Sequence, residues 1–95
     1  MKRTSAKIDK NQPAIVNALR QIPGVSVEVG HDDILVGYRG RTYWFEIKHP
    51  SAISKRTGMV KDSEITQSER DRLNKFSGHY SVVWDIKHIL AEVGI

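Results

Sequence analysis

A tight β-hairpin is the feature that most constrains the fold of this chain. Two runs with strand composition, DILVGY and RTYWFEIK, are separated only by Arg39 and Gly40. A glycine in a two-residue connection between such runs is typical of a hairpin turn. Counting outward from this turn sets the register of the two strands, and it places Asp33 directly opposite Glu46.

This register gathers charge on one face of the hairpin. Directly opposed side chains have Cβ atoms about 4.5–5.5 Å apart, and like charges in such a pair destabilise a sheet. Lys48 lies two residues beyond Glu46 and therefore points to the same side. The alternate positions predict an apolar face that packs on helices, and they are Ile34, Val36, Phe45 and Ile47.

A divalent cation would explain two carboxylates that point at one place. Mg²⁺ prefers oxygen ligands and keeps several waters and a substrate phosphate in its coordination shell. A lysine beside the cation would orient an attacking water or offset the charge that develops at phosphorus. The alternative is that these residues form an ordinary exposed ion pair on a solvated sheet face.

The rest of the chain predicts helices and strands in the order α-β-β-β-α-β-α. Thr66 and Glu69 have the spacing of a capping box and mark the start of the second helix. Segment 49–65 has no periodicity and predicts a long exposed loop. The other expected elements are helices at 11–22 and within 85–95, and strands at 25–29, 33–38, 41–48 and within 80–86.

Size, charge and composition limit the classes of function. A chain of 95 residues predicts one domain over 1–95, near the lower size limit for a single core, so a homodimer is expected. Lys and Arg number 15 against 11 Asp and Glu, which favours a polyanionic partner. The absence of cysteine excludes disulfides and thiolate zinc sites and favours a cytoplasmic setting. No apolar run reaches about 18 residues, so no membrane span is expected, and residues 1–8 predict a flexible basic N-terminus.

The charged hairpin also resembles a known family. Asp33, twelve intervening residues and then Glu46-Ile47-Lys48 are similar to the signature of the PD-(D/E)XK nucleases. Over nearly its full length the chain resembles the small phage and bacterial nucleases of the VRR-NUC type. The resemblance implies an α/β fold with a PD-(D/E)XK-like core, in which a mixed four-stranded sheet is flanked by helices. It also implies hydrolysis of DNA phosphodiester bonds that depends on Mg²⁺ or Mn²⁺, with branched DNA as one candidate substrate.

The same resemblance assigns roles to individual residues. It places Asp33, Glu46 and Ile47 at the metal and makes Lys48 the catalytic lysine. It also brings Gln67, on the second helix, near the active site.

The chain departs from the family pattern at two places. The proline that precedes the first aspartate in the family is Asp32 here, a third carboxylate available to the site. Many members carry a glutamate on the first helix, whereas this chain offers Gln12, an amide able to hold a metal-bound water.

Basic residues of the turn and of the long loop are the expected contacts to DNA phosphates, and they are Arg39, Arg41, Lys55, Arg56 and Lys61. Two alternatives to the nuclease stay open. The chain would be a DNA-binding module without catalysis if the departure on the first helix removes activity. It would be a structural or interaction protein if the charged hairpin face is an ordinary solvated surface.

Overall fold

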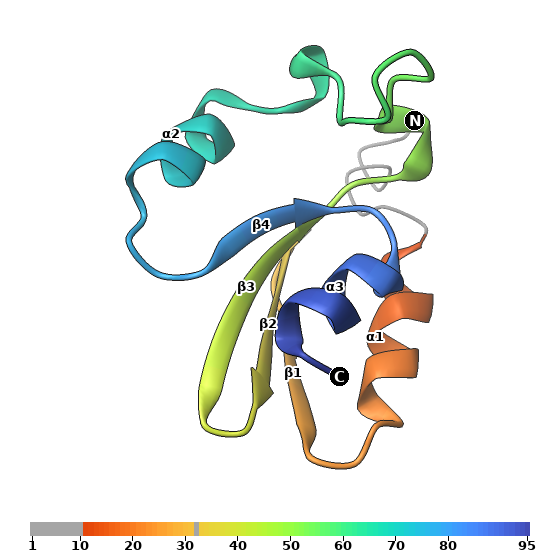
Figure 1. Cartoon of the computed structure of the whole chain (residues 1–95), viewed down its shortest axis with the longest axis vertical. Helices are drawn as coiled ribbons and strands as arrows, with labels where there is room; N and C mark the ends of the chain where they lie inside the picture. Colours follow the sequence, from red (N-terminus) through yellow and green to blue (C-terminus); the bar gives the residue numbers. More distant parts are fainter. Residues whose placement is uncertain (1–10, 32) are drawn as a thin grey trace.

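The computed structural model describes residues 11–31 and 33–95. It is an α/β fold with one mixed four-stranded sheet and three helices (Figure 1). The sheet order is β1-β2-β3-β4, with antiparallel pairing up to β3 and parallel pairing between β3 and β4. The elements are α1 (Gln12–Arg20), β1 (Val25–Val29), β2 (Asp33–Tyr38), β3 (Arg41–Ile47), α2 (Gln67–Lys75), β4 (Tyr80–Val83) and α3 (Ile86–Val93).

The predicted order of elements and the mixed sheet are therefore confirmed. The predicted flexible segment 1–8 and the accessory carboxylate of Asp32 lie outside the described residues. The last strand is shorter than expected, because Asp85 leaves the sheet to cap α3, where its side chain accepts a hydrogen bond from the backbone N–H of Lys87. No helix within the described ranges combines the length and the apolar character that a membrane span requires.

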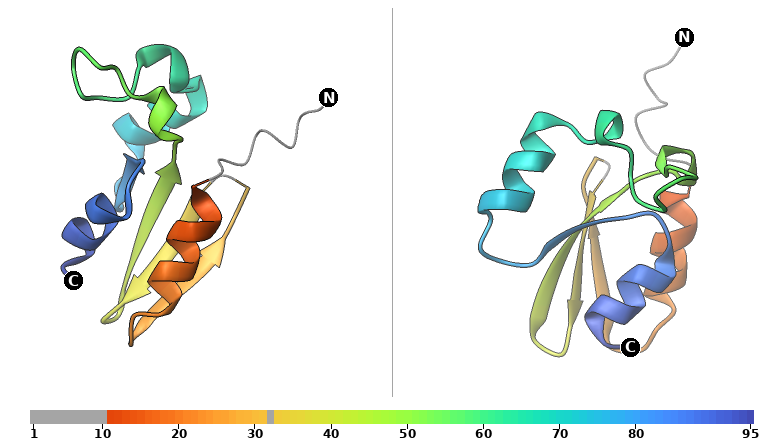
Figure 2. Two further views of the ribbon diagram at one scale, coloured as in Figure 1. Left: turned by 90° about the vertical axis from the view of Figure 1, so that its right-hand side faces the viewer. Right: turned by 45° about the horizontal axis from the view of Figure 1, so that its top comes forward.

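The two faces of the sheet are covered differently. Helices α1 and α3 lie together on one face, and α2 lies on the opposite face near β3 and β4 (Figures 1 and 2). The core lies under α1 and α3 and contains the four hairpin residues expected there, each at most 1% exposed. Its buried members are Ile15, Val16, Leu19, Val27, Ile34, Val36, Phe45, Ile47, Val83, Ile89 and Val93.

The hairpin has the predicted turn and register. Arg39 and Gly40 have φ angles of 53° and 78°, the left-handed values that a type I′ turn requires at both central positions. Asp33 pairs with Glu46 across the two strands. Because side chains alternate between faces, the charged positions lie on the face opposite the core.

The segment between β3 and α2 is more ordered than the sequence predicts. Two short 3₁₀ helices, η2 (Pro50–Ala52) and η3 (Asp62–Glu64), interrupt it. An isolated antiparallel bridge joins Ile53 to Val60 and closes a turn between them. The expected exposed loop is therefore only partly correct: its side chains are mostly exposed, but local hydrogen bonds shape its backbone.

The helices α1 and α2 begin near the end of the sheet that is remote from the hairpin turn. At α2 the predicted capping box of Thr66 and Glu69 is present. Asn11 precedes α1, but its side chain makes no capping bond and instead donates to the backbone carbonyls of Lys48 and Trp84, at 3.1 and 3.3 Å. The start of α1 is thereby fixed beside the residues that follow β3 and β4.

Candidate active site

The candidate site lies on the α2-covered face of the sheet, where β2 begins and β3 ends (Figure 2). Asp33 and Glu46 are paired in register there. Lys48 follows β3 directly and contacts Glu69 on α2. The three residues that the sequence placed on one face are therefore brought together, and α2 closes over them.

The carboxylate of Asp33 is held in a fixed orientation. Its Oδ2 accepts a hydrogen bond from Trp44 Nε1 at 2.7 Å. Trp44 packs edge-on against Phe76, which follows α2 directly, and against Tyr80 of β4, with ring centroids 5.2 and 5.1 Å away. A side chain at Gly30 would collide with the other carboxylate oxygen, so the glycine leaves room for Asp33.

Glu46 is a buried carboxylate, 3% exposed. Its Oε1 accepts a hydrogen bond from the Tyr80 hydroxyl at 3.2 Å and lies 3.9 Å from Arg72 Nη1. Arg72 also donates to the Tyr80 hydroxyl at 3.3 Å and lies over the Trp44 ring, 4.4 Å from its centroid. A buried carboxylate needs such partners because removing its charge from water is costly.

The protonation of Tyr80 suits its role as a donor to Glu46. Burial raises the pKa of Tyr80 well above its ordinary value. The hydrogen bond from Arg72 opposes this shift, whereas the negative charge of Glu46 adds to it. The phenol therefore keeps its proton at neutral pH and donates a hydrogen bond to the carboxylate of Glu46.

Lys48 is paired with a carboxylate that the sequence analysis did not assign to the site. Its Nζ lies 3.0 Å from Glu69 Oε1 and 3.1 Å from Oε2, and the two side chains are only 13% and 7% exposed. Glu69 is held in place because its Oε1 accepts the backbone N–H of Thr66 at 3.0 Å in the capping box. The capping box thus also positions the partner of Lys48.

The pKa of Glu69 reflects this environment. Burial raises the pKa, but the Thr66 hydrogen bond and the hydrogen bond and charge of Lys48 outweigh burial. The pKa of Glu69 therefore lies below its ordinary value. Glu69 is a carboxylate at neutral pH, and it holds the ammonium group of Lys48.

We expect replacement of Glu69 by Gln to reduce the loss of the free energy of unfolding that occurs as pH falls. A carboxyl whose folded pKa lies below the unfolded value, about 4.3, stabilises the fold above that pH. The contribution is lost as pH falls through the folded pKa. Glu69→Gln keeps an acceptor for the cap but loses the charge-assisted bond to Lys48, which costs about 1.5–3 kcal/mol at pH 7 and less at pH 3. Urea unfolding at both pH values measures this difference.

The control for that experiment is Asp71→Asn, on the exposed side of the same helix. Asp71 accepts a hydrogen bond only from Gln67 among the described residues. Its replacement should leave the pH dependence almost unchanged. If wild type and Glu69→Gln lose the same free energy of unfolding between pH 7 and pH 3, Glu69 does not have the charge assigned to it.

The structure places the other residues predicted for the site in different environments. Gln67 is exposed, and its Nε2 donates to Asp71 Oδ1 at 2.9 Å on the outer side of α2. Gln12 is 3% exposed in the first turn of α1, and its Oε1 has no hydrogen-bond partner within the described chain. The Ile47 side chain is fully buried in the core, so only its backbone carbonyl is available to a metal on the charged face.

The predicted DNA contacts fall into two separate groups. Lys55, Arg56 and Lys61 are exposed in the segment between η2 and η3. Arg39 and Arg41 lie at the hairpin turn, about 20 Å from Asp33 along the strand. Charge alone grouped these five residues, and the fold separates them.

The donor set at Asp33 and Glu46 fits a weakly held Mg²⁺ or Mn²⁺. In residues 11–31 and 33–95, no group of three or more His, Asp or Glu side chains is arranged to hold a metal ion. Mg²⁺ is commonly bound through one or two carboxylates, with waters and substrate phosphates completing its shell. Two opposed carboxylates at a sheet end therefore fit a metal that binds together with substrate.

Comparisons of the chain with models of protein families, with curated protein sequences and with solved structures find no match. The resemblance to the PD-(D/E)XK nucleases therefore stays a prediction that rests on the motif and on the geometry of the hairpin.

Proposed function

We propose that the protein is a nuclease that hydrolyses DNA phosphodiester bonds with the aid of Mg²⁺ or Mn²⁺. The observation that carries this proposal is the register of the hairpin, which sets Asp33 opposite Glu46, with Lys48 following on the same side. A bound divalent cation would supply positive charge at the scissile phosphate and lower the pKa of a water. Asp33 and Glu46 would hold that cation.

In this proposal Lys48 stabilises the charge that develops on the phosphate. Its side chain lies on the same side of the sheet as the carboxylate pair and its ammonium group is held by Glu69, so little reorganisation is needed during the reaction. A fixed cation in a partly dehydrated site stabilises a transition state more than one in water does. Glu69 acts through Lys48 as a positioning residue.

A DNA-binding module without catalysis is the second candidate. Two observations favour it: Gln12 stands on the first helix where many related nucleases carry a carboxylate, and Lys48 is already engaged by Glu69. Such a module would bind DNA through its exposed basic residues and would not need the carboxylate pair.

Cleavage assays decide between the two candidates. Purified protein is incubated with linear duplex, single-stranded and four-way-junction DNA, with EDTA, Mg²⁺ or Mn²⁺, and Asp33→Asn serves as the matched control. Metal-dependent cleavage by wild type alone supports the nuclease. DNA binding without cleavage under every condition supports the module. If the protein neither binds nor cleaves DNA, both candidates are overturned.

Sedimentation of the same sample tests the predicted homodimer.

We expect DNA binding to weaken steeply with salt through the segment between η2 and η3. The logarithm of affinity falls with the logarithm of salt concentration by about 0.9 for each phosphate neutralised. Replacing Lys55, Arg56 and Lys61 by Ala should therefore reduce this slope by up to about 2.7 and weaken binding similarly for all DNA sequences. Fluorescence anisotropy in EDTA at several salt concentrations measures the slope. A loss confined to one DNA sequence would show that this segment reads bases.

A further inference from the structure

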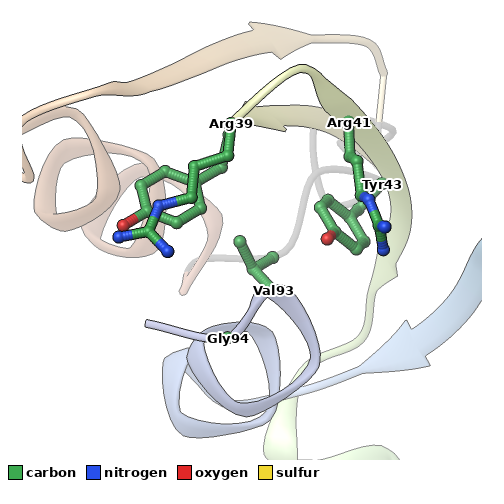
Figure 3. Close-up of a pocket in the computed structure, with 6 residues that line it drawn as sticks. Arg39, Arg41, Tyr43, Val93 and Gly94 are labelled. Atoms are coloured by element: carbon green, nitrogen blue, oxygen red, sulfur yellow. The ribbon is translucent and has the colours of Figure 1, made fainter.

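A polar pocket lies at the other end of the molecule, between the hairpin turn and the end of α3. Figure 3 shows Arg39 and Arg41 on either side of it, with Val93 and Gly94 of the α3 terminus below. Its volume is about 330 Å³, enough for a phosphate group and part of the molecule that carries it. The residues that line it are Tyr38, Arg39, Arg41, Tyr43, Val93 and Gly94.

The pocket is positively charged and its donors are unused. Within residues 11–31 and 33–95, neither Arg39 nor Arg41 forms an ion pair, and neither Tyr38 nor Tyr43 makes a hydrogen bond through its hydroxyl. The guanidinium of Arg39 lies over the Tyr38 ring, 5.1 Å from its centroid. This contact orients Arg39 but leaves the edge of its guanidinium group, which carries the N–H donors, available to a ligand.

The backbone at Arg39 supports a binding role. Its φ of 53° makes it the one described non-glycine residue with positive φ. Asn, Asp or Gly are favoured at this position of a type I′ turn, and a long side chain there is strained. An arginine kept in a strained position, beside a second arginine that forms no ion pair within the described residues, indicates that its side chain is used.

This pocket is separate from the candidate active site. Arg41 and Tyr43 alternate in phase with Phe45 and therefore lie on the face of the sheet that α1 and α3 cover, whereas Asp33 and Glu46 lie on the face that α2 covers. The pocket also lies about 20 Å along the hairpin from Asp33. A ligand here binds independently of the carboxylate pair.

We propose that this pocket binds the phosphate group of a phosphorylated ligand, a nucleotide or the end of a nucleic-acid strand. Two guanidinium groups provide planar pairs of N–H donors that match phosphate oxygens, and bidentate contacts of this kind are strong and directional. The two phenol hydroxyls supply further donors. Val93 forms an apolar wall, against which the sugar or base of the ligand packs.

The test uses Arg39→Asn, a variant that separates binding from stability. Asn followed by Gly is the preferred type I′ sequence, so the variant should melt about 4–8 °C higher than wild type. It should also bind phosphate about tenfold more weakly, because a charge-assisted contact is lost. A residue that serves only the turn would show the first effect without the second. Arg41→Gln, which leaves the turn unchanged, should lose binding alone.

Binding is followed through the arginine side-chain signals in NMR titrations without divalent metal, so the result does not depend on nuclease activity. The probes are inorganic phosphate, a 5′-phosphorylated trinucleotide, the same trinucleotide without its 5′-phosphate, and a short DNA duplex. Preference for the 5′-phosphate indicates a strand end or nucleotide, and equal binding of all nucleic acids indicates backbone phosphates. Lys75→Gln, an exposed residue in the last turn of α2 on the opposite face of the sheet, is the control and should bind the trinucleotide normally. No shift at Arg39 or Arg41 with any probe, or unchanged binding by Arg39→Asn, overturns the proposal.

Discussion

Replacing Lys48 with Met is expected to reduce DNA cleavage by about 10²–10³-fold, because one fixed electrostatic contact to the transition state is lost. Binding of Mg²⁺ or Mn²⁺ should remain, since Asp33 and Glu46 are unchanged. Methionine keeps much of the aliphatic length of lysine, so packing beside α2 is largely preserved. Single-turnover cleavage rates and metal-induced shifts in melting temperature measure the two effects separately.

The same substitution should also destabilise the protein, because it leaves the Glu69 carboxylate without its cation. The two side chains are 13% and 7% exposed, and breaking a buried pair by removing one partner costs about 3 kcal/mol or more. The double variant Lys48→Met with Glu69→Gln should recover much of this loss, because the neutral amide can still accept the Thr66 backbone N–H.

Activity and stability should therefore respond differently in the double variant. If Lys48 acts on the substrate, stability returns while cleavage stays low. If Lys48 is only one half of a structural ion pair, the double variant should recover cleavage together with stability. Wild-type cleavage by Lys48→Met would remove this residue from the mechanism.

The hairpin could be predicted from sequence because two independent signals agree there. Alternation of apolar residues fixes which positions face the core, and a two-residue turn at Gly40 fixes the register. A shift of one residue would have turned Phe45 away from the core and Glu46 into it. The geometry of Asp33 and Glu46 follows from these constraints, and no long-range information is needed.

The contribution of α2 could not be predicted in the same way. Its sequence, QSERDRLNK, is almost entirely polar, so no apolar stripe shows which side turns toward the sheet. Gln67 and Glu69 lie two positions apart and face different directions, and only tertiary packing selects Glu69. The capping-box spacing identified Glu69 as a helix residue, but the second role of its carboxylate depends on where β3 ends.

The separation of the basic residues was, in contrast, already contained in the predicted register. Arg41 has the same parity as Phe45 and Ile47, which the alternation assigns to the core-facing side. Grouping Arg41 with the loop residues relied on charge and ignored this parity. Strand parity therefore determines which face of the sheet carries Arg41, whereas net charge does not.

If Asp33 and Glu46 hold the proposed cation, Mg²⁺ or Mn²⁺ should stabilise the wild-type fold, because the unfolded chain has no such site. At a hundredfold excess over Kd, the gain in the free energy of unfolding is about 2.7 kcal/mol. Asp33→Asn and Glu46→Gln should each abolish most of this gain and also abolish cleavage. Thermal melts of all proteins in EDTA and in each metal measure it.

Stability without metal provides the decisive contrast. Asn at 33 can still accept the Trp44 Nε1–H bond, and Gln at 46 can still accept the Tyr80 hydroxyl. Each substitution removes one of two opposed negative charges, which destabilise a sheet when they are paired directly. The ion pair between Glu46 and Arg72 spans 3.9 Å and involves a guanidinium that is 29% exposed, so its loss costs little. Both variants should therefore be at least as stable as wild type in EDTA.

Glu28→Gln is the matched control, because Glu28 is an exposed carboxylate on the same face of the sheet and pairs across β1 and β2 with Leu35. It should keep the full metal response and the full cleavage rate. A metal response that is equal in all four proteins would mean that the ion binds elsewhere, and no response in wild type would remove the cation from the site. If Asp33→Asn and Glu46→Gln are destabilised in EDTA, the pair is structural, because its charges then serve the fold rather than a ligand.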